Sequence, residues 1–210
     1  MVEEGVMAGN ETDDTIPIGD ELLAERRGGP GTRMPDDMHP AARTVIHGID
    51  TVSEWVGRVV ALLVVPIMIA MVYEVIARKF FVAPTLWAFD VSRMLYGVSF
   101  MLGAGYALMH GLHIRADCIY RNFEVRTQGR IDFVLYIVLF MPAMIFLLKA
   151  GYDFALKSVI QGERAGDSTW APVVWPVKVS FAVGVALLLI QGVSEILKSW
   201  YAATRGRWPS

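Results

Sequence analysis

Ionisable residues stand at the two ends of one apolar segment, residues 86–120. At its start Asp90 and Arg93 are three positions apart and follow Trp87, so a helix would place the acid and the base on one face, where they can pair. The residues at its other end include His110, His113, Arg115 and Asp117. At roughly 1.5 Å per residue, the two ends lie about one membrane thickness apart and cannot form one site. The pattern therefore predicts a docking helix with an anchor at each end: Trp87, Asp90 and Arg93 at one, and His113, Arg115 and Asp117 at the other.

The apolar content of the chain indicates a membrane protein. Of its 210 residues 54% are hydrophobic and only 19% are charged. Four runs of 15 or 16 residues lack Asp, Glu, Lys and Arg: 59–73, 94–109, 133–148 and 179–194. With their flanking turns each reaches about 20 residues, enough for a helix to cross a hydrocarbon core. We predict an all-α integral membrane protein with four transmembrane helices. The alternative, a soluble all-α protein, would have shorter core helices with more frequent polar positions.

The chain divides into three parts by composition. Residues 1–40 contain ten acidic and three basic groups, with few apolar residues to offset the entropy of ordering them. This predicts a disordered, acidic cytoplasmic tail. Residues 41–201 are the predicted four-helix transmembrane domain, and residues 202–210 are a short cytoplasmic tail.

Two segments have the composition of membrane-interface elements. Before the first crossing, apolar residues recur at helical spacing while polar residues occupy the other face, which predicts an amphipathic lead-in. The apolar set is Val45, Ile49, Val52 and Val56, and the polar set is Arg43, Asp50, Ser53 and Glu54. Between the third and fourth crossings, residues 169–178 hold two tryptophans and two prolines and suit the interface. The glycines of residues 161–168 should end the third helix, and Pro66 should bend the first.

The second crossing carries a face of small residues. Gly103 and Ala107 are four positions apart, a spacing that lets neighbouring helix backbones approach closely in lipid. We predict that this face is a packing surface.

Polar groups are nearly missing from the middles of the predicted crossings, which argues against a pore or a complete transport site in this chain alone. The charged residues fall at helix ends, where long side chains can reach headgroups or water: Glu74, Asp90, Arg93, Asp132, Lys149, Glu195 and Lys198. The deepest polar residues are Ser99 and Gln191, and either can hydrogen-bond a neighbouring helix. No two histidines fall at mid-membrane on different helices, so we expect no haem, and the histidines should be interfacial or capping residues. Cys118 is the only cysteine, which excludes an intrachain disulfide and a thiol-pair enzyme. We therefore expect no catalytic residue, cofactor or metal.

Orientation follows from Lys and Arg near the ends of the crossings. With the N-terminus inside, nine of these residues fall on the cytoplasmic side and seven on the other. A compact group of four arginines between residues 115 and 130 favours the same arrangement, so both termini are expected in the cytoplasm.

These motifs together resemble the small permease subunit, DctQ-type, of tripartite ATP-independent periplasmic (TRAP) transporters. Trp87, Asp90 and Arg93 resemble the family's Trp-x-x-acidic-x-x-Arg motif, although the family more often has glutamate at the position of Asp90. Residues 103–117 resemble its small-residue helix end followed by His-x-x-x-Asp, and residues 167–199 are similar to its last loop and helix. The resemblance covers roughly residues 45–200.

The resemblance implies a multi-pass protein of the bacterial inner membrane without catalytic activity. Its partners would be a large DctM-type permease subunit, a periplasmic substrate-binding protein and membrane lipids, and no nucleic acid. The small subunit would be a rigid scaffold in sodium-gradient-driven uptake of an organic acid, C4-dicarboxylate-like or another carboxylate. Two other functions fit the composition: a membrane anchor of a redox enzyme, and a small transporter that works alone.

Overall fold

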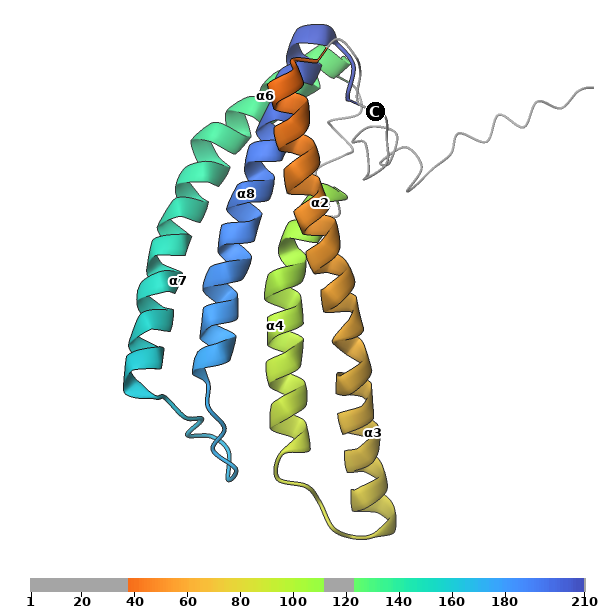
Figure 1. Cartoon of the computed structure of the whole chain (residues 1–210), viewed down its shortest axis with the longest axis vertical. Helices are drawn as coiled ribbons and strands as arrows, with labels where there is room; N and C mark the ends of the chain where they lie inside the picture. The colour runs from red at the N-terminus through yellow and green to blue at the C-terminus, as the bar shows by residue number, and fades with distance from the viewer. Residues whose placement is uncertain (1–37, 112–122, 210) are drawn as a thin grey trace, which may run out of the picture.

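The structure, a computed structural model, describes residues 38–111 and 123–209, and within these ranges the regular elements are helices without a β-strand. The elements are α2 (Pro40–Leu62), α3 (Val64–Phe80), α4 (Ala88–Met109), α6 (Val125–Leu135), the π-helix η1 (Tyr136–Phe140), α7 (Met141–Gln161) and α8 (Trp175–Arg205). They form antiparallel rods, in which α2 continues into α3 and α6 continues through η1 into α7 (Figure 1). The all-α prediction is confirmed for these residues. Most of the predicted acidic tail lies outside them.

Three of the rods are long and apolar enough to cross a membrane: Pro40–Phe80, Val125–Gln161 and Trp175–Arg205. Four crossings were predicted, and α4 is not among these three. The reason is its composition, because Asp90, Arg93 and several glycines, serines and tyrosines lower its mean hydropathy.

Proline accounts for the irregularities of two rods. Pro66 lacks an N–H and its ring crowds the carbonyl of Leu62, so the first rod is interrupted where it was predicted to bend. At the interruption the N–H of Leu63 bonds instead to the carbonyl of Val60, at 3.0 Å. In the third rod the π-helix directly precedes Pro142, and the Met141 N–H bonds five residues back to Tyr136. This wider turn rearranges the backbone bonding just before a residue that cannot donate.

The third rod ends as the sequence predicted. Its helix continues to Gln161, and Gly162 then takes a left-handed conformation with φ 57°. Glycine adopts this conformation without a steric penalty, so it is well suited to end a helix. The following residues form a turn closed by an isolated antiparallel bridge between Arg164 and Val173.

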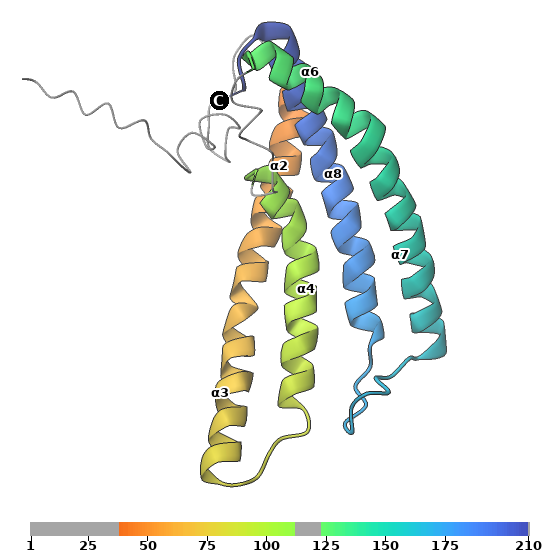
Figure 2. The same cartoon turned by 180° about the vertical axis from the view of Figure 1, so that it is seen from behind.

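The last helix, α8, is the centre of the packing. It contacts α2, α4, α6, η1 and α7, and it lies between α4 and α7 in both Figure 1 and the opposite view of Figure 2. At its closest approach to α4, a Cβ on Gly184 would lie 2.4 Å from the carbonyl oxygen of Met101. Gly129 of α6 is similarly close, with its Cβ position 2.5 Å from the Ala203 nitrogen. Glycines at helix contacts therefore let α4 and α6 pack directly on the α8 backbone.

The predicted lead-in is helical, and two residues of its polar face point into the protein. Asp50 and Ser53 are only 4% and 5% exposed and face α8, whereas Val45 and Val52 are 45% and 50% exposed. A lipid-facing surface is apolar, so Asp50 and Ser53 pair inside the protein.

Candidate functional site

The predicted pair of Asp90 and Arg93 is present at the start of α4, and it belongs to a larger cluster. The two side chains approach to 3.5 Å, and Arg93 makes a closer contact of 2.5 Å with Asp167 in the loop before α8. Ser168 of the same loop donates a hydrogen bond to Asp90. We call Asp90, Arg93, Asp167 and Ser168 the loop clamp, because these contacts fix the 162–174 loop to the start of α4.

Trp87, predicted to share the face of this pair, contacts a different helix. Its ring stacks on Tyr73 of α3, with ring centroids 5.8 Å apart. Nearby, Glu74 accepts hydrogen bonds from Arg78, at 3.0 Å, and from the backbone N–H of Thr85, at 2.9 Å. Glu74 and Asp90 were predicted to reach headgroups or water, and this was wrong, because both are buried within the fold. The turn between α3 and α4 is held by these contacts.

A second ion pair holds the same loop next to the end of α7. Lys178, in the first turn of α8, contacts Glu163 at 2.5 Å, just past the end of α7. Its ammonium group also lies 3.9 Å from the ring centroid of Phe154, a cation–π geometry. The loop is thus fastened to α4 and α8, and the cation–π contact joins α8 to α7.

These loop contacts predict a dependence of stability on pH. The hydrogen bond from Arg93 lowers the pKa of Asp167, and the hydrogen bond from Lys178 lowers the pKa of Glu163. A carboxyl group whose pKa is lower in the folded than in the unfolded state stabilises the fold above its ordinary pKa of about 4, and this contribution is lost as the pH falls through the lowered value. When the pH is lowered from 6.5 to 3.5, we expect the melting temperature of the double variant Asp167→Asn, Glu163→Gln to fall less than that of the wild type. Equal losses in a thermal unfolding assay would contradict this.

A buried ionic group joins α2 to α8 at the other end of the molecule. The ammonium of Lys198 lies 2.8 Å from Asp50 and 3.2 Å from Glu195. All three side chains are almost completely buried, with residue exposures of 1%, 4% and 1%. Buried charges of this kind need partners, and here one cation lies between two carboxylates.

Neutral side chains extend this group along the helix contact. Asp50 also accepts hydrogen bonds from the Gln191 amide and the Ser194 hydroxyl, both at 2.9 Å. Ser53 in turn donates to Gln191 at 2.6 Å. The prediction that Gln191 bonds to a neighbouring helix is confirmed. We call these six residues, Asp50, Ser53, Gln191, Ser194, Glu195 and Lys198, the buried polar network.

This network was not predicted from the sequence, although the spacing of its residues contains a signal. Positions 191, 194, 195 and 198 recur three or four apart, which places them on one face of α8, and positions 50 and 53 do the same on α2. Glu195 and Lys198 were predicted to extend to headgroups or water, and this was wrong. The network joins helices, and its polar atoms are used in holding α2 against α8.

The remaining predicted site residues are placed as follows. Gly103 lies against α2, because its Cβ position is 3.6 Å from Val60, and Ala107 is partly buried. His110 caps the C-terminal end of α4, with its Nδ1 3.1 Å from the Tyr106 carbonyl oxygen. His113, Arg115 and Asp117 lie outside the described residues.

Comparison with known protein families gives a match that covers most of the chain. Residues 67–201 match the family described as "Tripartite ATP-independent periplasmic transporters, DctQ component". The chain belongs to the DctQ family. A search among curated proteins found no significant match. The family assignment confirms the resemblance drawn from the motifs, and DctQ is a transporter component, not an enzyme. Nothing in it supports a redox anchor. The loop clamp lies entirely within the matched residues, whereas Asp50 and Ser53 of the buried polar network precede them.

Proposed function

We propose that this chain is the small scaffold subunit of a TRAP-type secondary transporter in the bacterial inner membrane. The DctQ match over residues 67–201 carries this proposal. In this transporter, a large DctM-type permease subunit binds the chain, and a periplasmic binding protein delivers an organic acid, C4-dicarboxylate-like or another carboxylate. The sodium gradient drives uptake, and the substrate and ion sites belong to the large subunit.

We propose further that α4 is the fourth membrane crossing. Its 22 residues span about 33 Å, close to the thickness of a hydrocarbon core. The start of α2 and the end of α8 lie together, where Met38, Ile46 and Tyr201 form a core cluster. Ends on one side of a membrane require an even number of crossings, which α4 supplies. The distribution of Lys and Arg supports a cytoplasmic location for these ends.

The ties between helices suit a scaffold. The loop clamp joins α4 to the loop at one end, and the buried polar network joins α2 to α8 towards the other. A subunit that holds the fixed part of a moving transporter must keep its own helices in place. The contacts of the loop clamp and of the buried polar network serve this purpose. Large exposed apolar side chains on α3 and α7, such as Met68, Ile69, Phe146 and Ile160, remain for lipid or the large subunit.

Co-purification tests this proposal. When the chain and its neighbouring large-subunit gene product are expressed together, a tag on this chain should recover the large subunit in detergent. Asp90→Ala or Arg93→Ala should lower that recovery several-fold while membrane insertion is unchanged, because each disconnects the loop clamp. Lys149→Ala, which removes an exposed cation of α7, should recover the wild-type amount. Purification of the wild-type chain without the large subunit would contradict the proposal.

A further inference from the structure

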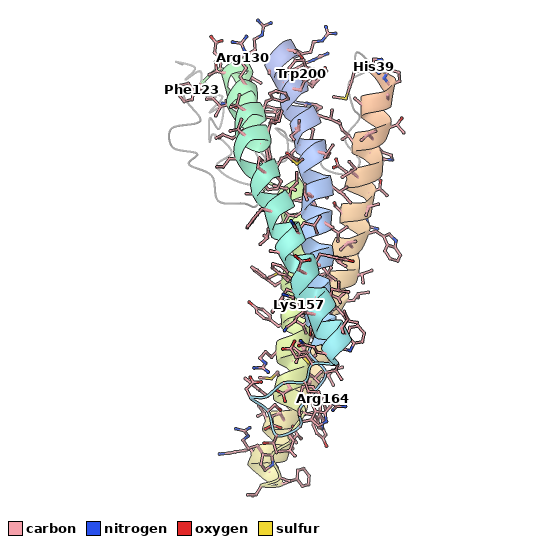
Figure 3. All side chains as sticks on the ribbon, turned by 90° about the vertical axis from the view of Figure 1, so that its left-hand side faces the viewer. His39, Phe123, Arg130, Lys157, Arg164 and Trp200 are labelled. Atoms are coloured by element: carbon pink, nitrogen blue, oxygen red, sulfur yellow. The ribbon has the colours of Figure 1, made fainter. Side chains whose placement is uncertain are left out.

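A pocket between α6 and α8 has no role in the function proposed above. Its volume is about 530 Å³, within the range of small-molecule sites. Arg126 and Arg130 of α6 line one part, Phe133 and Val134 continue the same rod, and Trp200 and Thr204 come from α8. Figure 3 shows Arg130 and Trp200 at the same end of the molecule as His39, near the start of α2 and far from Arg164.

The two arginines give the pocket a positive charge. They are four positions apart on α6 and so lie on one face, and both are exposed. Neither guanidinium has an ion-pair partner within residues 38–111 and 123–209. Arg126 lies against the end of α8, since its Nε is 3.0 Å from the point where a Cβ on Gly206 would stand. Two guanidinium groups suit a phosphate, which accepts several charge-assisted hydrogen bonds.

The other part of the pocket is apolar. Phe133 and Trp200 pack with ring centroids 5.1 Å apart, and Val134 is 55% exposed. From Arg130 to Val134 is one helical turn, a rise of about 6 Å, and over this distance the surface changes from charged to apolar. Such a change is typical of the boundary between headgroups and hydrocarbon, where tryptophan is also enriched.

We infer that this pocket binds an anionic phospholipid. Its phosphate lies between Arg126 and Arg130, and an acyl chain runs along Val134 and the exposed apolar residues that follow on the same rod. Basic pockets between membrane helices on the cytoplasmic side bind such headgroups. The inference rests on the proposed orientation, with this end of the α6–α7 rod and of α8 at the cytoplasmic face of a membrane, and it is independent of the transported substrate and of the large subunit.

Native mass spectrometry of the full chain in detergent tests the inference. Phosphatidylglycerol and phosphatidylcholine with identical acyl chains are titrated in parallel. We expect phosphatidylglycerol to bind about tenfold more tightly or better, because only this lipid carries a net negative charge. Inorganic phosphate at millimolar concentration should not displace it, since free phosphate lacks the acyl contacts. Equal affinity for the two lipids, or displacement by phosphate, would overturn the inference.

Variants locate the lipid in the pocket. Arg126→Gln with Arg130→Gln should reduce the preference for phosphatidylglycerol to nearly one. Lys149→Gln with Lys157→Gln removes the same charge from exposed positions further along the third rod and should leave the preference intact. Arg126→Lys with Arg130→Lys keeps the charge and should retain part of the preference. All variants should elute as the wild type does in gel filtration. An unchanged preference in the Gln pair, or an equal loss in the Lys149 and Lys157 pair, would place the lipid elsewhere.

Discussion

Replacing Lys198 with methionine is expected to lower the free energy of unfolding by about 3–5 kcal/mol. The substitution removes a cation that contacts both Asp50 and Glu195, at 2.8 and 3.2 Å, in a site closed to solvent. The two carboxylates would then be buried without this partner, which costs more than the ion pair itself contributes. Detergent-solubilised protein unfolded by SDS titration, followed by circular dichroism, measures the change.

Two further variants separate this effect from a loss of packing. Lys157→Met makes the same substitution at an exposed position of α7 and should change stability by no more than about 0.5 kcal/mol. Adding Asp50→Asn and Glu195→Gln to Lys198→Met removes all three charges and should restore most of the loss, because the two carboxylates that Lys198 neutralised are gone. If Lys198→Met is as stable as Lys157→Met, the buried polar network does not hold α2 to α8.

Replacing Gly184 with alanine is expected to destabilise the protein by about 1–3 kcal/mol. The new methyl group would lie 2.4 Å from the Met101 oxygen and 2.8 Å from its carbonyl carbon. Both atoms belong to the α4 backbone, so the clash cannot be relieved by rotating a side chain, and the two helices must move apart. The same unfolding assay measures the effect.

Gly48 is the matched control. It is also a helical glycine, on α2, but nothing lies within 4 Å of its Cβ position. Alanine is favoured over glycine in helices by up to about 1 kcal/mol, so Gly48→Ala should be neutral or stabilising. The two substitutions are therefore expected to act in opposite directions. Equal shifts in the same direction would contradict the close contact between α4 and α8.

The sequence was sufficient to predict the helices but not the faces they turn inward. Long runs without charge, the left-handed Gly162 and the break near Pro66 follow from local chemistry. The orientation of α2 does not, because an amphipathic pattern shows only that two faces differ. The pattern of the lead-in left open which face turns inward, and in the structure Asp50 and Ser53 face α8.

In the candidate site, too, some contacts were predictable from the sequence and others were not. The Asp90–Arg93 pair was predictable because three positions on a helix are neighbours in space. The contact of Arg93 with Asp167, 74 positions away, depends on how the loop folds back on α4. Lys198 shows a further difficulty: a lysine near a helix end usually extends to the headgroups, and only the polar residues of α2 opposite it make burial favourable.

Uptake measured with and without this chain tests the scaffold function most directly. Proteoliposomes would contain the large subunit with or without this chain, the cognate binding protein loaded with radiolabelled organic acid, and an inward sodium gradient. The proposal predicts sodium-dependent accumulation only when this chain is present, and none with this chain alone. Full uptake by the large subunit in its absence would contradict the proposal.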